Sequence, residues 1–369
     1  MKFGLGVPTG TEGLMYPVPY ADPAQAVQLA VEAERLGFDS VWGNDHVTTQ
    51  QYVRAEFDAP PRFYDPHLYL SYVAARTTRL RLATAITVMA FRHPVVAAKQ
   101  AATLDQLSGG RFVLGVGIGA YREETDAMWP GTTLHRGRQA EEFLASLETL
   151  LRDRRASFHG EFLRFEDVES YPKPVQTPLP ILSGGNAVGS RQRAARYGTG
   201  WLPAVLSPAE VAAGLADIRR AAEAIGRELP ADFDVAPQLS VAMGTSEADA
   251  MAAFERTQLH QHMRSLSGST LKGQQDGFAA RNLVGSTAQI QDQVHAYAEA
   301  GVTTLSALLF ACNTVEETLD QMARFAEEVI APVNAGTPDA LPPLPAATPA
   351  ATPAPAAGVP TPTTAGDAL

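Results

Sequence analysis

Residues 92–119 restrict the fold of this sequence more than any other segment. Apolar residues at helical spacing end at Ser108-Gly109-Gly110, and the run Arg111-Phe-Val-Leu-Gly-Val-Gly-Ile-Gly119 follows directly. Because this run is apolar at successive positions, both faces of the strand that it forms must be buried, as in a parallel strand between two layers. The segment therefore predicts one helix-strand unit of a repeating α/β fold.

Three glycines stand at alternate positions towards the end of this strand, at Gly115, Gly117 and Gly119. Glycine leaves out the side chain where strand becomes loop, so a flat ligand or its phosphate can approach the backbone closely. Tight packing inside a barrel would use the same glycines. The spacing is not the G-x-G-x-x-G fingerprint of dinucleotide binding, and both interpretations stay open.

Short apolar runs recur along the chain, with helical patterns between them. They predict eight strands, at residues 3–7, 40–43, 80–88, 112–116, 180–183, 200–202, 235–243 and 304–310. The helices carry their own start signals, such as the capping patterns Ser207-Pro-Ala-Glu210 and Ser286-Thr-Ala-Gln289. Eight strands that alternate with helices predict an α/β fold of the (β/α)8 TIM-barrel type, with doubly wound αβα layers as the alternative.

Three stretches do not fit the simple repeat. Residues 50–66 are rich in aromatic residues, prolines and charges, and residues 251–283 are polar with a Ser/Gly run. We predict that both are long loop insertions over the C-terminal mouth of the barrel. Residues 335–369 are dominated by Ala, Pro, Thr and Gly, which cannot bury enough apolar surface to offset the entropy of ordering. The prediction is a barrel domain at 1–334 and a disordered tail at 335–369.

Composition limits the kinds of partner. The formal net charge of −11 argues against nucleic acid, which is bound through clustered Lys and Arg. Cys312 is the single cysteine, so no disulfide can form within the chain and no cysteine-based metal cluster is expected. Glycine and proline interrupt the first eight residues before a secretory apolar region could form, and no run approaches membrane-spanning length. These features predict a cytoplasmic protein that binds a small molecule, without nucleic acid or membrane.

Several short motifs occur in a fixed order. They are Gly37-Phe-Asp-Ser-Val-Trp-Gly-Asn-Asp-His46, Arg92-His-Pro94, Leu107-Ser-Gly-Gly-Arg-Phe112, Pro172-Lys-Pro174, Ile181-Leu-Ser-Gly-Gly-Asn186 and Arg193-Ala-Ala-Arg-Tyr-Gly-Thr-Gly-Trp201. In this order and spacing the chain resembles the luciferase-like flavin- and deazaflavin-dependent oxidoreductases, over roughly residues 1–330. The resemblance implies a barrel with the cofactor across the C-terminal ends of the strands, where barrel active sites lie in general.

Within that family, three motifs most resemble the branch that uses the deazaflavin coenzyme F(420). They are the strand end Asn44-Asp45-His46, the helix entry Arg92-His-Pro94 and the loop Gly184-Gly185-Asn186. The FMN-dependent monooxygenases share much of this pattern, so FMN is the alternative cofactor.

The chain departs from both branches after the glycine-rich strand. Bacterial luciferases have a phosphate-binding arginine where this chain has Ile118. The deazaflavin sugar-phosphate dehydrogenases have an acidic proton donor where this chain has Ala120. Glu123 or Glu124 could replace that acid only if the loop bends back.

His46 is the first catalytic candidate, because a side chain at a strand end points into the barrel mouth and histidine titrates near neutral pH. It would transfer a proton to or from the substrate, or stabilise charge near the deazaflavin ring. A histidine that is only held by Asp45 or by a backbone carbonyl is the alternative. Asp45 itself could orient His46, contact the cofactor or cap the following loop.

The resemblance also implies contacts to the cofactor ring. In the family, a strand commonly bends at the position of Thr84-Ala85-Ile86-Thr87, with a bulge and a non-proline cis peptide behind the ring. This places the cis bond at Ala85-Ile86, with Ile86 behind the ring. Ordinary strand core is the alternative for these residues.

Gly184, Gly185 and Asn186 lie between a predicted strand and a predicted helix near Ser190. The free N–H groups at the start of that helix can hold a phosphate, which makes these three residues cofactor-binding candidates. A plain turn is the alternative.

Other candidates carry weaker signals. Trp42 and Trp201 could line the pocket, but each is more often a core residue. His260 and His262 could chelate a metal, but they lack acidic neighbours and we assign no metal site.

The sequence thus predicts an oxidoreductase that transfers a hydride between coenzyme F(420) and a small organic substrate. An FMN-dependent monooxygenase that uses oxygen is the alternative enzyme, and a barrel that binds flavin without catalysis is the alternative of another class. The resemblance also implies a homodimer formed through barrel helices.

Overall fold

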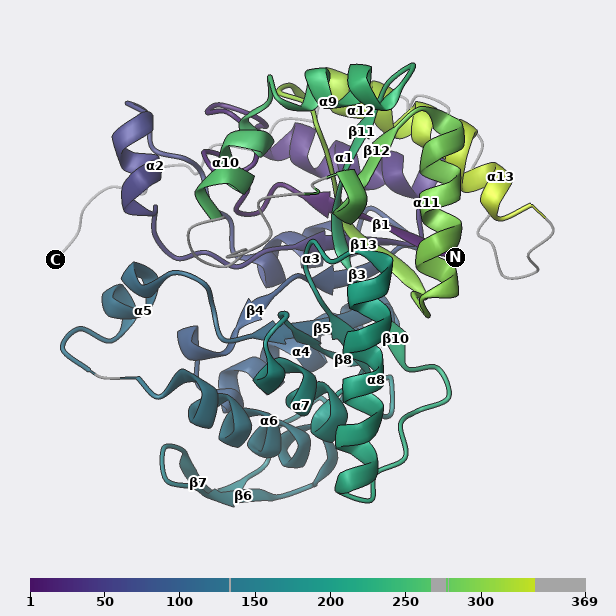
Figure 1. Ribbon diagram of the computed structural model, residues 1–369. Helices are drawn as coiled ribbons and strands as arrows, with labels where there is room; N and C mark the ends of the chain where they lie inside the picture. Colours follow the sequence, from purple (N-terminus) through teal and green to yellow (C-terminus); the bar gives the residue numbers. More distant parts are fainter. Residues whose placement is uncertain (133, 267–276, 278, 336–369) are drawn as a thin grey trace, which may run out of the picture.

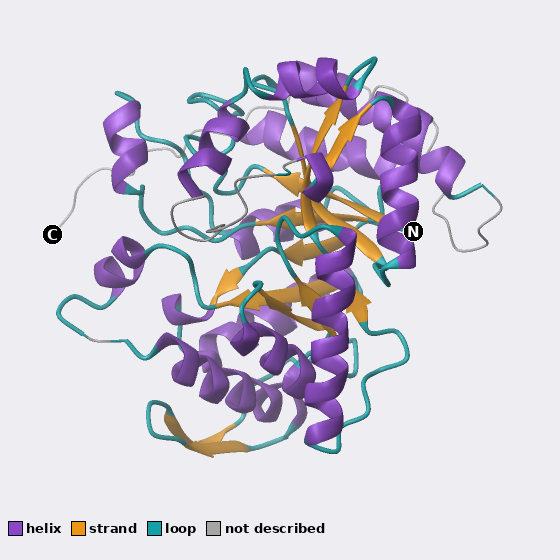
Figure 2. Cartoon of the chain, viewed as in Figure 1, coloured by secondary structure: helices purple, strands orange, loops and turns teal. Residues whose placement is uncertain are grey.

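The computed structural model describes residues 1–132, 134–266, 277 and 279–335 of the chain. Strands gather in the middle of the molecule and helices surround them (Figure 1, Figure 2). The wall strands are β1 (Lys2–Val7), β2 (Ser40–Gly43), β3 (Arg81–Thr84), β4 (Thr87–Val88), β5 (Phe112–Gly117), β8 (Ile181–Gly184), β9 (Gly200–Leu202), β10 (Asp234–Val235), β11 (Gln238–Met243) and β13 (Thr304–Phe310). They pair in parallel in the order β10-β9-β8-β5-β3-β2-β1-β13-β11, and β4 also pairs with β5.

The segment that contains β10 and β11 closes this sheet into a barrel. β10 pairs with β9 on one side, and β11 pairs with β13 on the other. Between them, the N–H of Gln238 donates to the carbonyl oxygen of Pro203 at 2.8 Å, and the N–H of Ser306 donates to that of Pro237 at 2.9 Å. Because one segment is hydrogen-bonded on both sides, the sheet has no open edge there. The (β/α)8 barrel is confirmed, and the doubly wound alternative is wrong.

All eight predicted strands lie in the wall, but two of them are broken. The run at 80–88 divides into β3 and β4, and the run at 235–243 divides into β10 and β11 at Ala236-Pro237. Proline has no N–H to donate, which accounts for the second break. The sequence patterns missed β12 (Leu283–Gly285), which pairs with β11, and the antiparallel hairpin of β6 (Ala156–His159) and β7 (Arg164–Val168). The hairpin is largely exposed, so it lacks the apolar run that marks a wall strand.

The helices pack around the barrel. They are α1 (Pro23–Leu36), α2 (Gln51–Glu56), α3 (Pro66–Ala74), α4 (Pro94–Ser108), α5 (Arg122–Met128), α6 (Arg136–Arg152), α7 (Val188–Tyr197), α8 (Pro208–Ala224), α9 (Glu247–Phe254), α10 (Gln258–Leu266), α11 (Thr287–Glu299), α12 (Val315–Phe325) and α13 (Ala331–Val333), with single turns η1 (Met89–Phe91), η2 (Ala279–Arg281) and η3 (Ala326–Ile330). The predicted capping boxes of α8 and α11 are present, at Ser207 with Glu210 and at Ser286 with Gln289. No helix in the described part of the chain is both long and apolar enough to span a membrane.

The two predicted loop insertions are partly helical, so that part of the prediction is wrong. Residues 50–66 contain α2, and residues 251–283 contain the end of α9, all of α10, and η2. These helices are short, so they contain too few apolar residues for a helical period to be recognised in the sequence. Residues 267–276 and 278 of the second insertion, and residues 336–369 of the predicted tail, lie outside the described residues. The domain boundary after residue 334 stays a prediction.

Three clusters of buried apolar residues build the core, and the third lies around Ala242, Phe254 and Val284. The largest cluster lies between the wall and the helices, and it includes Trp201, whose ring would lie 2.3 Å from a Cβ on Gly214 of α8. A smaller cluster contains Trp42, Ala83, Val113, Leu182, Leu202, Ala236 and Ala307. Trp201 is therefore a core residue, whereas Trp42 lines the cavity at the barrel mouth.

The glycines of β5 lie close against the neighbouring strand. A Cβ on Gly115 would lie 1.9 Å from the carbonyl oxygen of Thr84, and one on Gly117 would lie 2.1 Å from Cδ1 of Ile86. Both contacts are far below van der Waals distance. The carbonyl of Thr84 is backbone, so tight barrel packing requires glycine at 115, whereas a larger residue at 117 would have to displace the end of the Ile86 side chain. Gly119 has φ +78°, a left-handed conformation that favours glycine.

Replacing Gly115 with alanine tests this packing. Gly115→Ala places a methyl group against the backbone of Thr84. The two strands cannot move apart to make room, because β3 also pairs with β2 and β5 also pairs with β8. We expect the free energy of unfolding to fall by about 3 kcal/mol or more, measured by urea denaturation. The control is Gly137→Ala in the first turn of α6, where nothing lies within 4 Å of the added Cβ, and which should be neutral or slightly stabilising. Equal stability of the two variants would contradict the packing role.

Candidate active site

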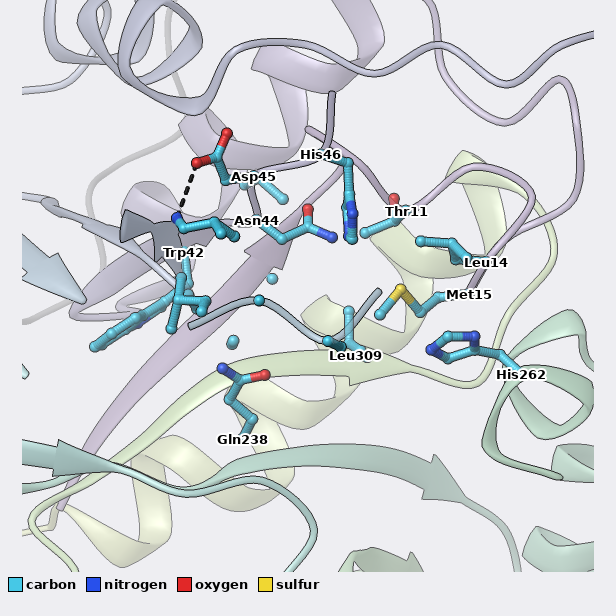
Figure 3. A pocket seen from close by; sticks show the side chains of 18 of the residues that line it. Thr11, Leu14, Met15, Trp42, Asn44, Asp45, His46, Gln238, His262 and Leu309 are labelled. Carbon is cyan, nitrogen blue, oxygen red and sulfur yellow. Dashed lines mark hydrogen bonds between the residues drawn. The ribbon is translucent and has the colours of Figure 1, made fainter. Parts of the chain in front are cut away.

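A cavity of about 190 Å³ opens at the C-terminal ends of the wall strands. The residues that line it are Gly6, Val7, Thr11, Leu14, Met15, Trp42, Asn44, Asp45, His46, Ala85, Ile86, Val88, Gly119, Ala120, Tyr121, Glu124, Gln238, His262, Ala307 and Leu309. Figure 3 shows the ring of His46 directed into this pocket from one side and the amide of Gln238 from the other. The position is the one where barrel enzymes carry their active sites.

Ala85 and Ile86 line the cavity, and the peptide bond between them is cis. The resemblance implies a cis bond at this position. The side chain of Ile86 fills the space beside Gly117 and Gly184, whose added Cβ atoms would lie 2.1 and 2.6 Å from it. Both glycines were cofactor-binding candidates, and in the structure they make room for Ile86.

Thr84, the residue before this cis peptide, is fully buried and does not line the cavity. Its hydroxyl donates to the carbonyl oxygen of Gly115 at 2.8 Å and accepts from the hydroxyl of Thr87 at 3.0 Å. The hydroxyl therefore supplies a hydrogen bond to the carbonyl oxygen of Gly115 on β5, next to the break between β3 and β4. Its predicted contact to a cofactor has no support in this geometry.

His46 pairs with Glu124 rather than with Asp45. Nδ1 of His46 lies 3.1 and 3.2 Å from the two carboxylate oxygens of Glu124, and the N–H of Val47 donates to the same carboxylate at 3.0 Å. Glu124 comes from α5 and is almost completely buried. The loop after β5 therefore bends back over the mouth. This is the condition under which Glu124 could replace the acid that related enzymes have at the position of Ala120.

Nδ1 of His46 has two neighbours, the carboxylate of Glu124 and the amide nitrogen of Gln50, which lies 3.3 Å away. In the tautomer that donates to the carboxylate, Nδ1 carries the proton and Nε2 keeps its lone pair. The rings of Phe63 and Tyr121 lie 5.4 and 5.8 Å from the imidazole and restrict its orientation. Nε2 can therefore accept a proton from a molecule in the cavity, while Glu124 stabilises the resulting imidazolium.

Asp45 holds the strand ends together. Its carboxylate accepts hydrogen bonds from Arg92 at 2.6 and 3.2 Å and from the N–H of Val88 at 2.9 Å. Figure 3 shows the last of these as a dashed line. Both charged side chains are largely buried, so loss of either one would leave an unpaired buried charge. Asp45 thus links the end of β2 to β4 and to the entry of α4, and it does not contact the ring of His46.

A second polar group comes from the two insertions. Tyr52 of α2 lies 3.1 Å from Nδ1 of His262 on α10, and its hydroxyl lies 3.4 Å from that of Tyr121. Burial, with a smaller contribution from His46, lowers the pKa of His262 to about 3, and burial raises the pKa of Tyr121. His262 and Tyr121 therefore stay neutral near pH 7 and offer hydrogen bonds rather than charge. His260 instead packs against Phe254, so the two histidines diverge.

The loop at Gly184, Gly185 and Asn186 is fixed by its own hydrogen bonds. The side chain of Asn186 donates to the carbonyl oxygen of Ala204 at 2.8 Å and accepts from its N–H at 2.9 Å. The carbonyl oxygen of Gly185 accepts from Nε1 of Trp201 at 2.9 Å. The helix that follows, α7, has no side-chain cap at Ala187, so its first N–H groups are available to an anion.

The mouth has the features that a flavin-like ring requires. Ile86, Trp42 and Leu309 supply apolar surface, and the imidazole of His46 supplies a polar group. Asn44 also lines the cavity, but its amide is hydrogen-bonded to Thr9 and Gly10. Oγ1 of Thr11 is buried at this cavity with no hydrogen-bond partner in the described part of the chain. Such an atom is normally paired in a protein, so it indicates a ligand here. The residues that line the cavity fit a ring with one polar edge, whereas the candidates Gly184, Gly185 and Asn186 and the start of α7 are not among them.

Sequence reasoning named His46 and kept Glu124 as a conditional candidate, but it did not foresee Tyr52, Tyr121 or Gln238. The aromatic richness of residues 50–66 was the only signal for Tyr52. Nothing in the sequence around Gln238 marks it as a cavity residue.

A closed barrel with a histidine–carboxylate pair at its C-terminal mouth defines an α/β-barrel enzyme. The chain belongs to the family of the luciferase-like monooxygenases, whose model matches residues 1–304. The family that the motifs indicated is therefore confirmed.

Two relatives carry different cofactors in their names. The F420-dependent glucose-6-phosphate dehydrogenase of Kineococcus radiotolerans is 33% identical over 183 residues, which are 49% of this chain and 52% of that protein. The FMNH(2)-dependent dimethylsulfone monooxygenase of Pseudomonas putida is 33% identical over 202 residues, which are 54% of this chain and 53% of that protein. The chain thus matches about half the length of each.

Solved structures agree on the fold. The monooxygenase RslO1 from Streptomyces bottropensis superposes with a TM-score of 0.72 at 24% identity, over 89% of this chain and 99% of that one.

Proposed function

We propose that this protein transfers a hydride between coenzyme F(420) and a small organic substrate at the barrel mouth. The observation that carries the proposal is His46, which faces the cavity and is held by the buried carboxylate of Glu124. When bound, the deazaflavin ring supplies a two-electron hydride acceptor or donor. The motifs at Asn44-Asp45-His46 and the F420-dependent relative support this branch.

The chain itself handles the proton. When a substrate alcohol is oxidised, its hydroxyl proton passes to Nε2 of His46, and the reverse transfer accompanies reduction of a carbonyl. Glu124 stabilises the charged imidazole and so replaces the acid that is absent at Ala120. The ion pair of Asp45 with Arg92 keeps the strand ends in place. In this proposal Ala85 and Ile86 pack against the face of the deazaflavin ring. The N–H groups near Gly185 bind the phosphate of the cofactor.

An FMN-dependent monooxygenase is the second candidate. The FMNH(2)-dependent relative is as similar as the F420-dependent one, and Ala120 lacks the acid typical of the deazaflavin sugar-phosphate dehydrogenases. In that function the apolar side chains of Leu14 and Met15 at the mouth would exclude water from a reactive intermediate.

Titration of the cofactor-free protein separates the two candidates. We expect coenzyme F(420) to bind with a micromolar or lower dissociation constant and FMN at least about tenfold more weakly, because the motifs favour the deazaflavin. Fluorescence and calorimetry would follow both cofactors in oxidised and reduced form. Preferential binding of FMN would support the monooxygenase, and binding of neither would overturn both assignments.

Variants at the histidine–carboxylate pair test catalysis. With a substrate from an anaerobic screen, His46→Gln should lower kcat by about 10²- to 10⁴-fold, because the proton acceptor is lost. Glu124→Gln should give a smaller loss and shift the pH profile of kcat. Glu123→Gln is the control, since within the described residues its carboxylate accepts a single hydrogen bond, from the N–H of Gln51 at 3.4 Å.

The dissociation constant of the cofactor should change little in Glu124→Gln and Glu123→Gln, and much less than kcat in His46→Gln, whose side chain lines the cavity. A barrel that binds flavin without catalysis would show no turnover in the unmodified protein. Turnover that survives His46→Gln would remove the proposed role of the histidine.

We further propose a homodimer through α3 and α4. Leu68, Tyr72 and Val96 are exposed apolar side chains, and the first two lie one helical turn apart on α3. Sedimentation velocity should show a dimer, and Leu68→Glu should shift it to monomer because a charge cannot be buried there unpaired. A monomer in the unmodified protein would contradict the proposal.

A further inference from the structure

The side chain of Trp42 lies between the candidate active site and the interior of the barrel. Trp42 lines the cavity at the mouth, and it is 3% exposed. It also belongs to a buried cluster inside the barrel, whose other members are Ala83, Val113, Leu182, Leu202, Ala236 and Ala307. Among these six described residues, Ala307 is the only one that lines the cavity. The other five therefore lie deeper in the barrel than the cavity reaches.

The indole of Trp42 is directed down the barrel, away from the mouth. Its Nε1 donates to the hydroxyl of Ser40 at 2.8 Å, two residues earlier on the same strand. A Cβ on Gly4, which pairs with Ser40 across the sheet, would lie 2.2 Å from the same nitrogen. Glycine at position 4 thus leaves the space that the indole occupies, and the hydroxyl of Ser40 fixes the orientation of the ring.

The side chains around this indole are small. Barrel interiors are generally filled by layers of bulky side chains from alternate strands. Here Gly4 and Ser40 share one level of the sheet, and three of the six other cluster members are alanine. The single large side chain of Trp42 fills much of this space. Its removal would therefore extend the cavity at the mouth into the barrel.

We propose that Trp42 determines how far a substrate extends into the barrel, and that it restricts the enzyme to substrates that are compact on this inner side. The inference rests on the proposed function, in which the reacting oxygen of the substrate lies at Nε2 of His46. Trp42 closes one end of the pocket, whereas Met15 and His262 lie towards the opposite end (Figure 3). An alkyl chain or ring that extends inward from the reacting carbon meets the indole.

Free indole tests this geometry without cofactor or turnover. Trp42→Ala removes the side chain and leaves a hole with the shape of the probe, open to the mouth. Calorimetry should show that indole binds to Trp42→Ala at least about tenfold more tightly than to the unmodified protein, because an apolar cavity takes up an apolar ligand of matching size. Nuclear Overhauser effects from bound indole to the methyl groups of Ile86 should place it beside the mouth, since Ile86 lines the cavity and packs against the same cluster.

Leu202→Ala is the matched control. Leu202 belongs to the same cluster but does not line the cavity, and its removal leaves a hole that is smaller than indole and lies beyond Trp42. This variant should bind indole as the unmodified protein does. Circular dichroism would check the fold of both variants. If Trp42→Ala folds only in the presence of indole, that recovery supports the proposal.

A series of secondary alcohols of increasing chain length tests specificity with the conservative variant Trp42→Phe, which keeps an aromatic ring and so disturbs the core less. The ratio of kcat/KM for a longer alcohol to that for a shorter one should rise by at least about tenfold, because each methylene group that a pocket accommodates changes this ratio by about that factor. The ratio should stay unchanged in Leu202→Ala.

Equal binding of indole by the unmodified protein and by folded Trp42→Ala would overturn the proposal, and so would an unchanged chain-length preference in Trp42→Phe. Absence of turnover with every alcohol in the unmodified protein would count against the proposed function instead. The indole measurement would then still decide whether Trp42 closes the inner end of the cavity, since it needs neither cofactor nor substrate.

Discussion

The ion pair between Asp45 and Arg92 is the interaction on which the barrel mouth depends. It joins the end of β2 to the entry of α4, and its carboxylate also accepts the N–H of Val88 on β4. Three separate segments therefore share one buried carboxylate. Because both side chains are largely buried, neither can be replaced alone without leaving an unpaired charge in the protein interior. The backbone that carries His46 directly follows this fixed point.

The histidine owes its chemistry to a residue from another part of the chain. Glu124 lies 78 positions from His46 and reaches it because α5 folds back over the mouth. In the tautomer that donates to this carboxylate, Nδ1 carries the proton and Nε2 is left towards the cavity. Sequence order offered Asp45, the adjacent acid, as the partner, but that carboxylate is already occupied by Arg92. The aromatic rings of Tyr121 and Phe63 then restrict the imidazole from either side.

Two arginines hold groups of the mouth from behind. Arg92, at the entry of α4, donates to the carboxylate of Asp45, and Nη1 of Arg136, at the start of α6, donates to the carbonyl oxygen of Gly119 at 2.9 Å. Because Asp45 and Gly119 both line the candidate active site, the two helix entries help to fix its shape.

Local pattern alone determined the wall strands, the helix caps and the family. A buried parallel strand must be apolar on both faces and a cap needs an oxygen at a set position, so the eight strands and the capping boxes at Ser207 and Ser286 could be read directly. β12 and α10 were missed because they lie within or at the end of the polar stretch 251–283, whose composition predicts a loop.

Tertiary structure decided how the candidate residues are used. Gly117 and Gly184, which suit a close ligand by sequence, make room for Ile86, and the hydroxyl of Thr84 satisfies Gly115. The partner of His46 and the place of His262 beside Tyr52 depend on contacts between distant segments. Such contacts are fixed by the packing of the whole barrel and leave no periodic trace in the chain. That is why the sequence determined the fold and the family, while only the structure determined which side chains meet.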